Sequence, residues 1–165
     1  GSQNFFAEQL LKTIGLEKLG FGSVVNGVNA VKEIFAEIGL NPDNIIMADG
    51  SGLSHLNMVT PRQVVELLKY MYSNKKVYYD FYNSLPIAGV DGTLGKRMKN
   101  TSAENVVRAK TGYIGFVRSL SGYAVTGDNE PIAFSMIANN FSVPVKLADN
   151  LQDLVCLRLT NFRRK

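Results

Sequence analysis

The spacing of apolar residues changes near Val106, and this change constrains the fold more than any other feature of the chain. Upstream of it, apolar residues recur every three or four positions, which is the period of an amphipathic helix. Helical patterns cover residues 5–19, 23–38 and 61–71. We expect Gly15 to end the first helix and Gly39 to cap the second, while Pro61 suits the first turn of the third.

Downstream of Val106, β-branched and aromatic residues dominate and short turns separate the stretches. The strands expected there cover residues 106–114, 117–125 and 131–139. Links this short favour antiparallel pairing, with Thr126-Gly127-Asp128-Asn129 as a hairpin turn. A short strand is also expected over residues 44–48, and a closing helix that starts at Pro144 or Val145 and ends at Phe162. This order of elements predicts an α+β fold with helices packed on an antiparallel sheet.

The charge pattern argues against a nucleic-acid-binding protein. The chain has 165 residues, with 18 Lys plus Arg against 14 Asp plus Glu and a formal net charge of +4. The basic residues gather around Lys96, Arg97 and Lys99 and in the Arg163-Arg164-Lys165 tail, and they form no stripe with stacking aromatic residues. We therefore expect a solvated basic surface. No apolar run is long enough to span a bilayer.

The single cysteine, Cys156, allows no intrachain disulfide. It lies in an apolar helical pattern with Leu151, Leu154, Val155 and Leu159, which favours a buried structural thiol over a nucleophile. No cluster of His, Cys, Asp and Glu has the spacing of metal ligands, so neither a metal nor another cofactor is expected.

The stretch Ala109-Lys110-Thr111-Gly112 carries the clearest chemical signal. On a strand, the Lys110 ammonium and the Thr111 hydroxyl can meet one carboxylate, and Gly112 lets a substrate backbone lie against the strand edge. The triplet also occurs by chance in lysine-rich turns, so its weight depends on the rest of the chain.

Four further segments accompany this triplet in one order along the chain. They are Ser2-Gln3-Asn4-Phe5-Phe6-Ala7-Glu8-Gln9-Leu10-Leu11, Ala48-Asp49-Gly50-Ser51-Gly52-Leu53-Ser54, Leu85-Pro86-Ile87-Ala88-Gly89-Val90-Asp91-Gly92-Thr93-Leu94 and Ser119-Leu120-Ser121-Gly122-Tyr123. From Ser2 to about Asn140 the chain resembles the penicillin-binding DD-carboxypeptidase/endopeptidase family of the penicillin-binding protein 4 (DacB) type, peptidase family S13. Such enzymes use Ser-x-x-Lys, Ser-x-Asn and Lys-Thr-Gly motifs for serine acyl transfer. The resemblance implies the C-terminal half of a β-lactamase/transpeptidase-like fold, with residues 1–165 as a single partial domain.

The resemblance also implies roles for individual residues. Ser2 would relay a proton to the leaving amine, and the Asn4 amide would orient the substrate and the lysine. Lys110 would attract the terminal carboxylate of the substrate and Thr111 would hydrogen-bond it, while the N–H of Tyr113 would form half of the oxyanion hole. Two alternatives stay open for Ser2, because it could simply cap the first helix and because expression vectors also leave a Gly-Ser pair.

Two positions depart from the family pattern. Members often carry an arginine where His55 stands, and that arginine can hold a carboxylate on the third residue of the stem peptide. An imidazole there replaces a permanent fork-shaped cation. Gly115 stands where some members place a polar side chain. His55 is thus a candidate substrate-binding residue whose simpler interpretation is an exposed loop residue, and the substrate side-chain preference stays open.

The nucleophile of the family is missing from these residues. The only Ser-x-x-Lys match is Ser73-Asn74-Lys75-Lys76, which ends a helix where the family's nucleophile begins one. It also falls between the other two motifs instead of preceding both. Chance explains it best.

The favoured hypothesis is therefore the C-terminal part of a serine D-Ala-D-Ala carboxypeptidase/endopeptidase that acts on peptidoglycan stem peptides, binds β-lactams and works outside the cytoplasmic membrane. Alone, the chain is expected to be inactive. The alternatives are a non-catalytic module that binds D-Ala peptides or penicillin, and a related β-lactamase. We also expect an exposed apolar face that causes self-association or binds the missing N-terminal half of the catalytic domain.

Overall fold

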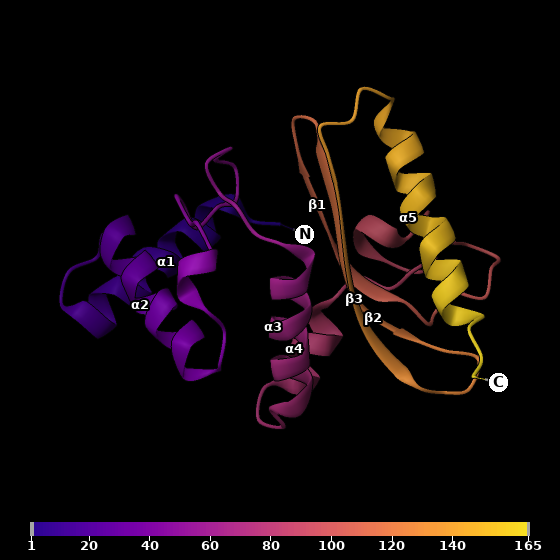
Figure 1. The fold of residues 1–165 in the computed structure, drawn as a ribbon, viewed down its shortest axis with the longest axis horizontal. Coiled ribbons are helices and arrows are strands. Elements are labelled where there is room, and N and C mark those ends of the chain that lie inside the picture. Colours follow the sequence, from indigo (N-terminus) through magenta and orange to yellow (C-terminus); the bar gives the residue numbers. More distant parts are fainter. Residues whose placement is uncertain (1, 165) are drawn as a thin grey trace. The chain divides into compact units, whose positions relative to one another are not determined.

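The computed structural model describes residues 2–164, which form two compact units that meet in sequence between Gln63 and Val64. The first unit is helical, and the second contains a three-stranded antiparallel sheet with helices on its faces (Figure 1). The α+β prediction is therefore confirmed. The treatment of the chain as a single partial domain stays a prediction.

The first unit contains α1 (Asn4–Leu19), α2 (Val24–Glu37) and the short 3₁₀ helix η1 (Pro42–Asn44). The expectation that Gly15 ends the first helix is wrong, because α1 continues to Leu19 and Gly20, at φ 77°, caps it. Gly15 has a packing role instead. A Cβ at Gly15 would lie 2.6 Å from the backbone nitrogen of Gly27, so the two glycines let α1 and α2 approach backbone to backbone.

The ends of α2 follow the sequence signals. The Ser23 hydroxyl accepts a hydrogen bond from the N–H of Asn26 at 3.1 Å, as an N-cap does. After the helix, Gly39 takes a left-handed conformation at φ 81°. The strand expected over residues 44–48 is wrong, since only the single bridge between Ile46 and Met58 forms there. Past that bridge, the side chain of Asn57 and not a second strand accepts the backbone N–H of Ala48, at 2.7 Å.

Helix α3 (Pro61–Ser73) spans the boundary between the units, and α4 (Tyr78–Ser84) and the 3₁₀ helix η2 (Gly92–Leu94) follow it. The strands are β1 (Arg108–Ile114), β2 (Val117–Val125) and β3 (Pro131–Asn139), and α5 (Val145–Thr160) closes the chain. The second and third strands have the predicted bounds. The first begins two residues later than predicted, because the backbone groups of Asn105 and Val107 hydrogen-bond to Ala88 just before it.

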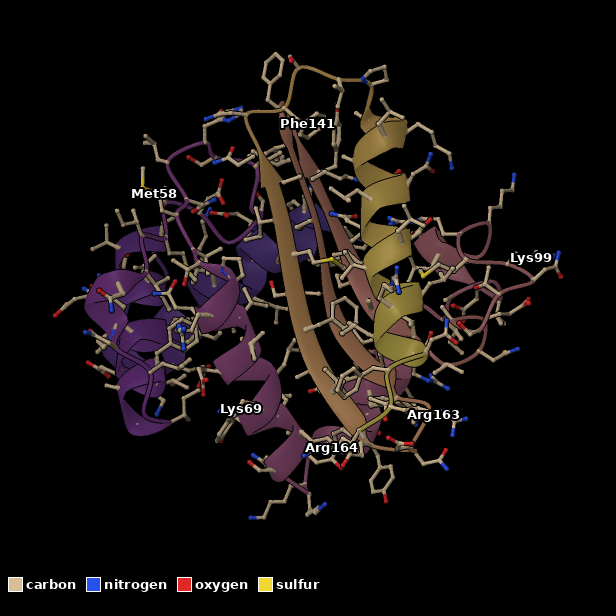
Figure 2. All side chains as sticks on the ribbon, turned by 45° about the vertical axis from the view of Figure 1, so that its right-hand side comes forward. Met58, Lys69, Lys99, Phe141, Arg163 and Arg164 are labelled. Atoms are coloured by element: carbon tan, nitrogen blue, oxygen red, sulfur yellow. The ribbon has the colours of Figure 1, made fainter. Side chains whose placement is uncertain are left out.

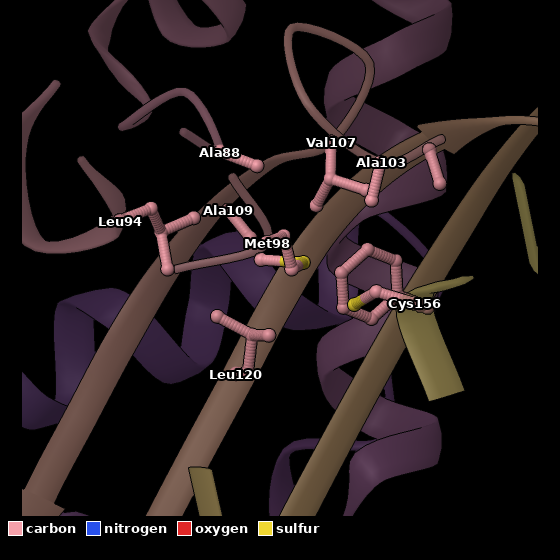
Figure 3. Close-up of a cluster of buried hydrophobic side chains, with 10 residues drawn as sticks. Ala88, Leu94, Met98, Ala103, Val107, Ala109, Leu120 and Cys156 are labelled. Carbon is pink, nitrogen blue, oxygen red and sulfur yellow. The ribbon is translucent and has the colours of Figure 1, made fainter. Parts of the chain in front are cut away.

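Both faces of the sheet are covered within the second unit. On one face, α5 packs over residues of all three strands, and Figure 3 shows the resulting buried cluster around Leu120 and Cys156. On the other face, Tyr123 of β2 packs with Leu68 of α3 and with Leu85. The Tyr123 hydroxyl donates to the carbonyl of Leu68 at 2.6 Å, and burial raises the pKa of this tyrosine to about 12.

The thiol of Cys156 is fully buried, as predicted. Burial, and then the nearby Asp153 carboxylate, raise the pKa of Cys156 to about 12. A thiol held in its neutral form is a poor nucleophile. Cys156 is therefore a packing residue.

The face of α5 that packs on the sheet differs from the predicted one. The inward residues are small or polar: Ala148, Gln152, Cys156 and Thr160. Leu151 and Leu154 are each 61% exposed on the outer face, although they were expected to share the buried face with Cys156. Apolar residues at helical spacing share one side of the helix, but their spacing does not show whether that side packs on the sheet.

The expectation of a solvated basic surface is wrong for Arg97, which is only 7% exposed. Its guanidinium contacts the carboxylates of Asp149 at 3.0 Å and Asp153 at 2.7 Å on α5. Lys99, two residues later, points outward from the same segment, as Figure 2 shows. The sequence could not separate the two because the ion-pair partners of Arg97 lie 52 and 56 residues away along the chain. None of the helices described is long and apolar enough to span a membrane.

Candidate active site

The Lys-Thr-Gly triplet lies on β1, at an outer edge of the sheet. On its inner side, β1 pairs with β2, with Lys110 opposite Ser121 and Gly112 opposite Ser119. On its outer side, the segment before it forms one bridge, between Ile87 and Arg108. The N–H of Ala109 donates to the carbonyl of Pro86 at 3.0 Å, and the pairing of that segment stops there. Among the described residues of the second unit, no strand pairs with the outer edge from Lys110 onward.

This bridge fixes the direction of the next backbone groups. In an antiparallel ladder, alternate residues direct their N–H and C=O groups to the same edge. Because the N–H of Ala109 points to the outer edge, the backbone groups of Thr111 and Tyr113 point there as well. An extended peptide could therefore add to β1 through these two residues.

Lys110 lies on the face of the sheet that carries α3 and α4. Its ammonium donates to the carbonyl of Thr111 at 2.9 Å. Partial burial lowers the pKa of Lys110 from its ordinary value. The cation is thus less well solvated than a free surface lysine, which strengthens its attraction to an anionic ligand.

The Thr111 side chain lies on the opposite face from that of Lys110, as alternation along a strand requires. It is nearly buried, at 9% exposure, and its hydroxyl donates to the hydroxyl of Thr93 at 3.0 Å. Thr93 belongs to η2 and is exposed. Thr93 thus places a second hydroxyl beside that of Thr111, which is the only one of the two that sequence reasoning found. The contact of Thr111 with a carboxylate stays a prediction.

Gly112 and Tyr113 complete the triplet region. A Cβ at Gly112 would overlap the hydroxyl of Ser119, so a side chain here would force that hydroxyl to turn. The Tyr113 ring is 58% exposed, and the Arg118 guanidinium lies 5.7 Å from its centroid. The backbone N–H of Tyr113 points to the open edge of β1, and its role in an oxyanion hole stays a prediction.

The Ser-x-Asn segment lies in the first unit, at the start of α1. Ser2 is exposed and precedes the helix, and Asn4 is its first residue. The alternative that Ser2 caps the helix is wrong, because Gln3 is the N-cap residue and no side chain caps this end.

The Asp49–Ser54 loop packs against the same end of α1. The Glu8 carboxylate accepts the N–H of Gly50 at 2.8 Å, and a Cβ at Gly50 would lie 2.7 Å from the carbonyl oxygen of Ala7. Only glycine allows this approach. The loop thereby fixes the first turns of α1, which carry Asn4.

Asp49 organises the loop itself. Its carboxylate accepts the N–H of Gly52 at 2.7 Å and of Ser54 at 2.8 Å. It also accepts the side-chain amide of Asn57 at 2.9 Å. Burial acts to raise the pKa of Asp49, but the hydrogen bonds from the amide and the two N–H groups outweigh it and lower the pKa below the ordinary value of 3.8. The charged form is therefore the one that the loop stabilises.

Replacing Asp49 with alanine is expected to reduce the free energy of unfolding at pH 7 by about 1–2 kcal/mol, because three donors lose an ionised acceptor. The stabilisation is present above the ordinary pKa and is lost as the pH falls through the lowered one. The difference between wild type and Asp49→Ala should therefore shrink below about pH 3.8. Urea unfolding of both proteins at pH 7 and pH 3 measures this difference in the free energy of unfolding. The matched control is Asp43→Ala on η1, whose effect should stay under about 0.5 kcal/mol.

His55 is exposed in a turn of this loop, in the first unit. The simpler interpretation of His55 as an exposed loop residue agrees with this placement, and its role in binding substrate stays a prediction. Ser73 is the last residue of α3, and its hydroxyl donates to the carbonyl of Tyr70 at 2.8 Å. A nucleophile at the polar end of a helix lacks the buried lysine that would activate it. The interpretation of Ser73 as a chance match agrees with this placement.

Ser2, Asn4 and His55 thus belong to the first unit, and residues 110–113 to the second. Sequence reasoning missed Glu8, Asn57 and Thr93, although Glu8 and Thr93 stand within the segments that carried the resemblance. Within residues 2–164, no group of three or more His, Cys, Asp and Glu side chains could hold a metal ion.

Comparison with known proteins gives consistent matches along the chain. The family described as D-Ala-D-Ala carboxypeptidase 3 (S13) matches residues 1–158. A D-alanyl-D-alanine carboxypeptidase of Actinomadura sp. (strain R39) is 41% identical over 166 residues, which cover 98% of this chain and 30% of that relative.

Solved structures agree. Penicillin binding protein 4 (dacB) from Haemophilus influenzae has a TM-score of 0.84 at 30% sequence identity, over 93% of this chain and 37% of that one. The same protein complexed with a β-lactam has a TM-score of 0.84 over 94% of this chain and 39% of that one. The chain thus spans about a third of the length of these similar proteins.

Proposed function

Because the chain belongs to the D-Ala-D-Ala carboxypeptidase 3 (S13) family, we propose that it forms the substrate-binding part of a serine-type D-alanyl-D-alanine carboxypeptidase/endopeptidase. The substrate would be a peptidoglycan stem peptide, and β-lactams would compete for the same site. The protein would act outside the cytoplasmic membrane, in the periplasm or at the outer face of the envelope. The observation that carries the proposal is the open edge of β1 at Lys110, Thr111 and Tyr113.

The proposed mechanism divides binding from chemistry. The peptide would lie antiparallel to β1, with its terminal carboxylate near Lys110 and the Thr111–Thr93 hydroxyl pair. A serine supplied by a Ser-x-x-Lys segment outside these residues would attack the D-alanyl carbonyl, and its proton would pass to the lysine of that segment. The Tyr113 N–H would stabilise the resulting oxyanion.

Ser2 and Asn4 would then serve the leaving group. As the C–N bond breaks, Ser2 would pass a proton to the departing D-alanine amine and regain one from the protonated lysine of the Ser-x-x-Lys segment, while Asn4 holds the peptide. An acyl-enzyme remains on the nucleophilic serine, and water would hydrolyse it. This assignment requires Asn4 and Lys110 to act in one groove. No step requires a cofactor.

The chain alone should not react covalently with penicillin, because its only Ser-x-x-Lys match lies at the end of α3. Incubation with a fluorescent penicillin and denaturing electrophoresis should give no labelled band. A full-length family member treated in parallel serves as the positive control. A band that maps to Ser73 would refute the proposal.

A second candidate is a module that binds peptides ending in D-alanine without turnover. The observation in its favour is that the Lys110–Tyr113 edge is formed within the second unit by itself. Calorimetry with a D-Ala-D-Ala peptide separates the two functions. Binding by the isolated chain that Lys110→Ala abolishes would favour the module, whereas a lack of binding favours the partial enzyme.

A further inference from the structure

Thr93 is an exposed threonine in the second unit whose neighbours hold its backbone in place. Leu94, the next residue, is fully buried in the cluster that Figure 3 shows. The carbonyl of Leu94 accepts the N–H of Gly89 at 3.0 Å. Two residues before Thr93, the Asp91 carboxylate accepts the N–H of Ile87 at 2.7 Å. The turn that carries Thr93 is therefore fixed on both sides of the exposed hydroxyl.

The buried ion network holds the same turn from a third direction. Arg97 follows Thr93 by four residues, and its guanidinium contacts Asp149 at 3.0 Å and Asp153 at 2.7 Å on α5. Asp149 also accepts the Nε of Arg118 at 2.6 Å. Because Arg118 belongs to β2, which pairs with β1, the network fixes η2 and the sheet against one helix. An exposed polar side chain on so rigid a support is well placed for recognition.

The hydroxyls of Thr93 and Thr111 differ in what they can offer a ligand. A hydroxyl has a single proton to donate. The nearly buried Thr111 donates its proton to the Thr93 oxygen at 3.0 Å. No printed bond in the described part of the second unit uses the proton of Thr93, and accepting one hydrogen bond polarises a hydroxyl so that it donates another more strongly. A carboxylate accepts hydrogen bonds and donates none, so Thr93 is the better donor of the pair.

The open edge of β1 would bring the end of a peptide to this hydroxyl. The outer pairing stops where the N–H of Ala109 meets the carbonyl of Pro86. A peptide antiparallel to β1 would run from Tyr113 toward Thr111, and Pro86 would stop its C-terminus there. Its terminal carboxylate would therefore lie beside Thr111, which the Thr93 hydroxyl contacts.

We propose that Thr93 is a substrate-binding residue whose hydroxyl donates a hydrogen bond to the terminal carboxylate of the peptide. Thr111 acts through Thr93, as the positioning residue whose proton orients and polarises that hydroxyl. Lys110 supplies the positive charge. The inference rests on the proposed function, since it concerns the same ligand and the same edge, but it adds a residue outside the Lys-Thr-Gly triplet. A neutral ester in place of the carboxylate accepts a weaker hydrogen bond, so Thr93 should matter most for free acids.

Acylation of the complete protein by benzylpenicillin and by its methyl ester tests the inference. The ester is measured by its competition with fluorescent penicillin. Thr93→Val keeps the shape of the side chain and removes the donor, and it should slow acylation by the free acid about 10–100-fold, as loss of a hydrogen bond to a charged group does. The rate with the ester should change by less than about threefold. Thr93→Ser keeps the hydroxyl and should restore the preference for the free acid.

Thr101→Val is the matched control on the same segment. Its hydroxyl donates to the carbonyl of Met98 at 2.5 Å, so its loss should lower the melting temperature and leave the acid-to-ester ratio of rates unchanged. Thr111→Val should lower that ratio less than Thr93→Val does, because the direct donor remains.

Three results would overturn the inference and leave the proposed function standing. They are an unchanged rate in Thr93→Val, an equal loss for acid and ester, and a larger loss of the ratio in Thr111→Val than in Thr93→Val. The last result would make Thr111 the direct donor. A wild-type protein that benzylpenicillin does not acylate at all would instead refute the proposed function, and the inference with it.

Discussion

Replacing Arg97 with methionine is expected to lower the free energy of unfolding of the second unit by about 3–5 kcal/mol, the cost of removing one member of a buried ion network. Arg97 contacts two carboxylates of α5, and its guanidinium also donates to the Gln152 side chain at 3.3 Å. Asp149 would keep Arg118, whose Nε lies 2.6 Å from it, but Asp153 would lose the ion pair that it forms with Arg97. The network joins the 92–101 segment to α5, so its loss should also loosen the packing of that helix.

Urea unfolding followed by circular dichroism measures this effect. The control is Lys99→Met, because Lys99 is an exposed side chain on the same segment, and it should change the free energy of unfolding by less than about 0.5 kcal/mol. If Arg97→Met costs less than about 1 kcal/mol, the network contributes little beyond what apolar packing provides, as happens for some buried ion pairs.

Replacing Lys110 with alanine in the complete protein is expected to slow acylation by penicillin by about 10²–10³-fold, the range found when a preorganised electrostatic group is removed from an acyl-transfer site. The side chain is at the β1 edge and partly desolvated, so a water molecule cannot reproduce its charge. Lys110→Arg should recover part of the rate, because the positive charge remains while the donor geometry changes.

Labelling with fluorescent penicillin, quenched at successive times, gives the acylation rate. The melting temperature checks that the fold is intact. Lys69→Ala is the control, since Lys69 lies on the exposed side of α3 and forms an ion pair with Glu66 at 2.9 Å. An unchanged acylation rate in Lys110→Ala would show that Lys110 takes no part in acylation. A lowered melting temperature in that variant alone would point to a structural role.

Local patterns predicted most of the elements because those elements depend on neighbouring residues. β-Branched and aromatic runs with short turns located β2 and β3, and Ser23 and Gly39 marked the ends of α2. The errors concern contacts between distant segments. Gly15 was taken as a helix end because its packing against Gly27 cannot be read from α1 alone.

In the candidate site, too, local motifs were predictable and contacts between distant segments were not. The Lys-Thr-Gly triplet and the Ser-x-Asn segment are visible as short motifs, and the chemistry of their side chains follows from residue type. The partner of Thr111 was not predictable, because Thr93 lies eighteen residues away on η2. The carboxylate of Asp49 was seen only as part of a turn, since its hydrogen bond to Asn57 depends on how that loop closes.

The bridge between Ile87 and Arg108 has a consequence for ligand length. A peptide lying on β1 can continue past Ile114, where the strand ends, but in the other direction it meets Pro86 and Ile87 immediately after Lys110. Whichever way it runs, such a peptide has room for a long tail on one side only. If a peptide adds to this edge as we propose, the bridge would favour the end of a chain over its middle by steric obstruction alone.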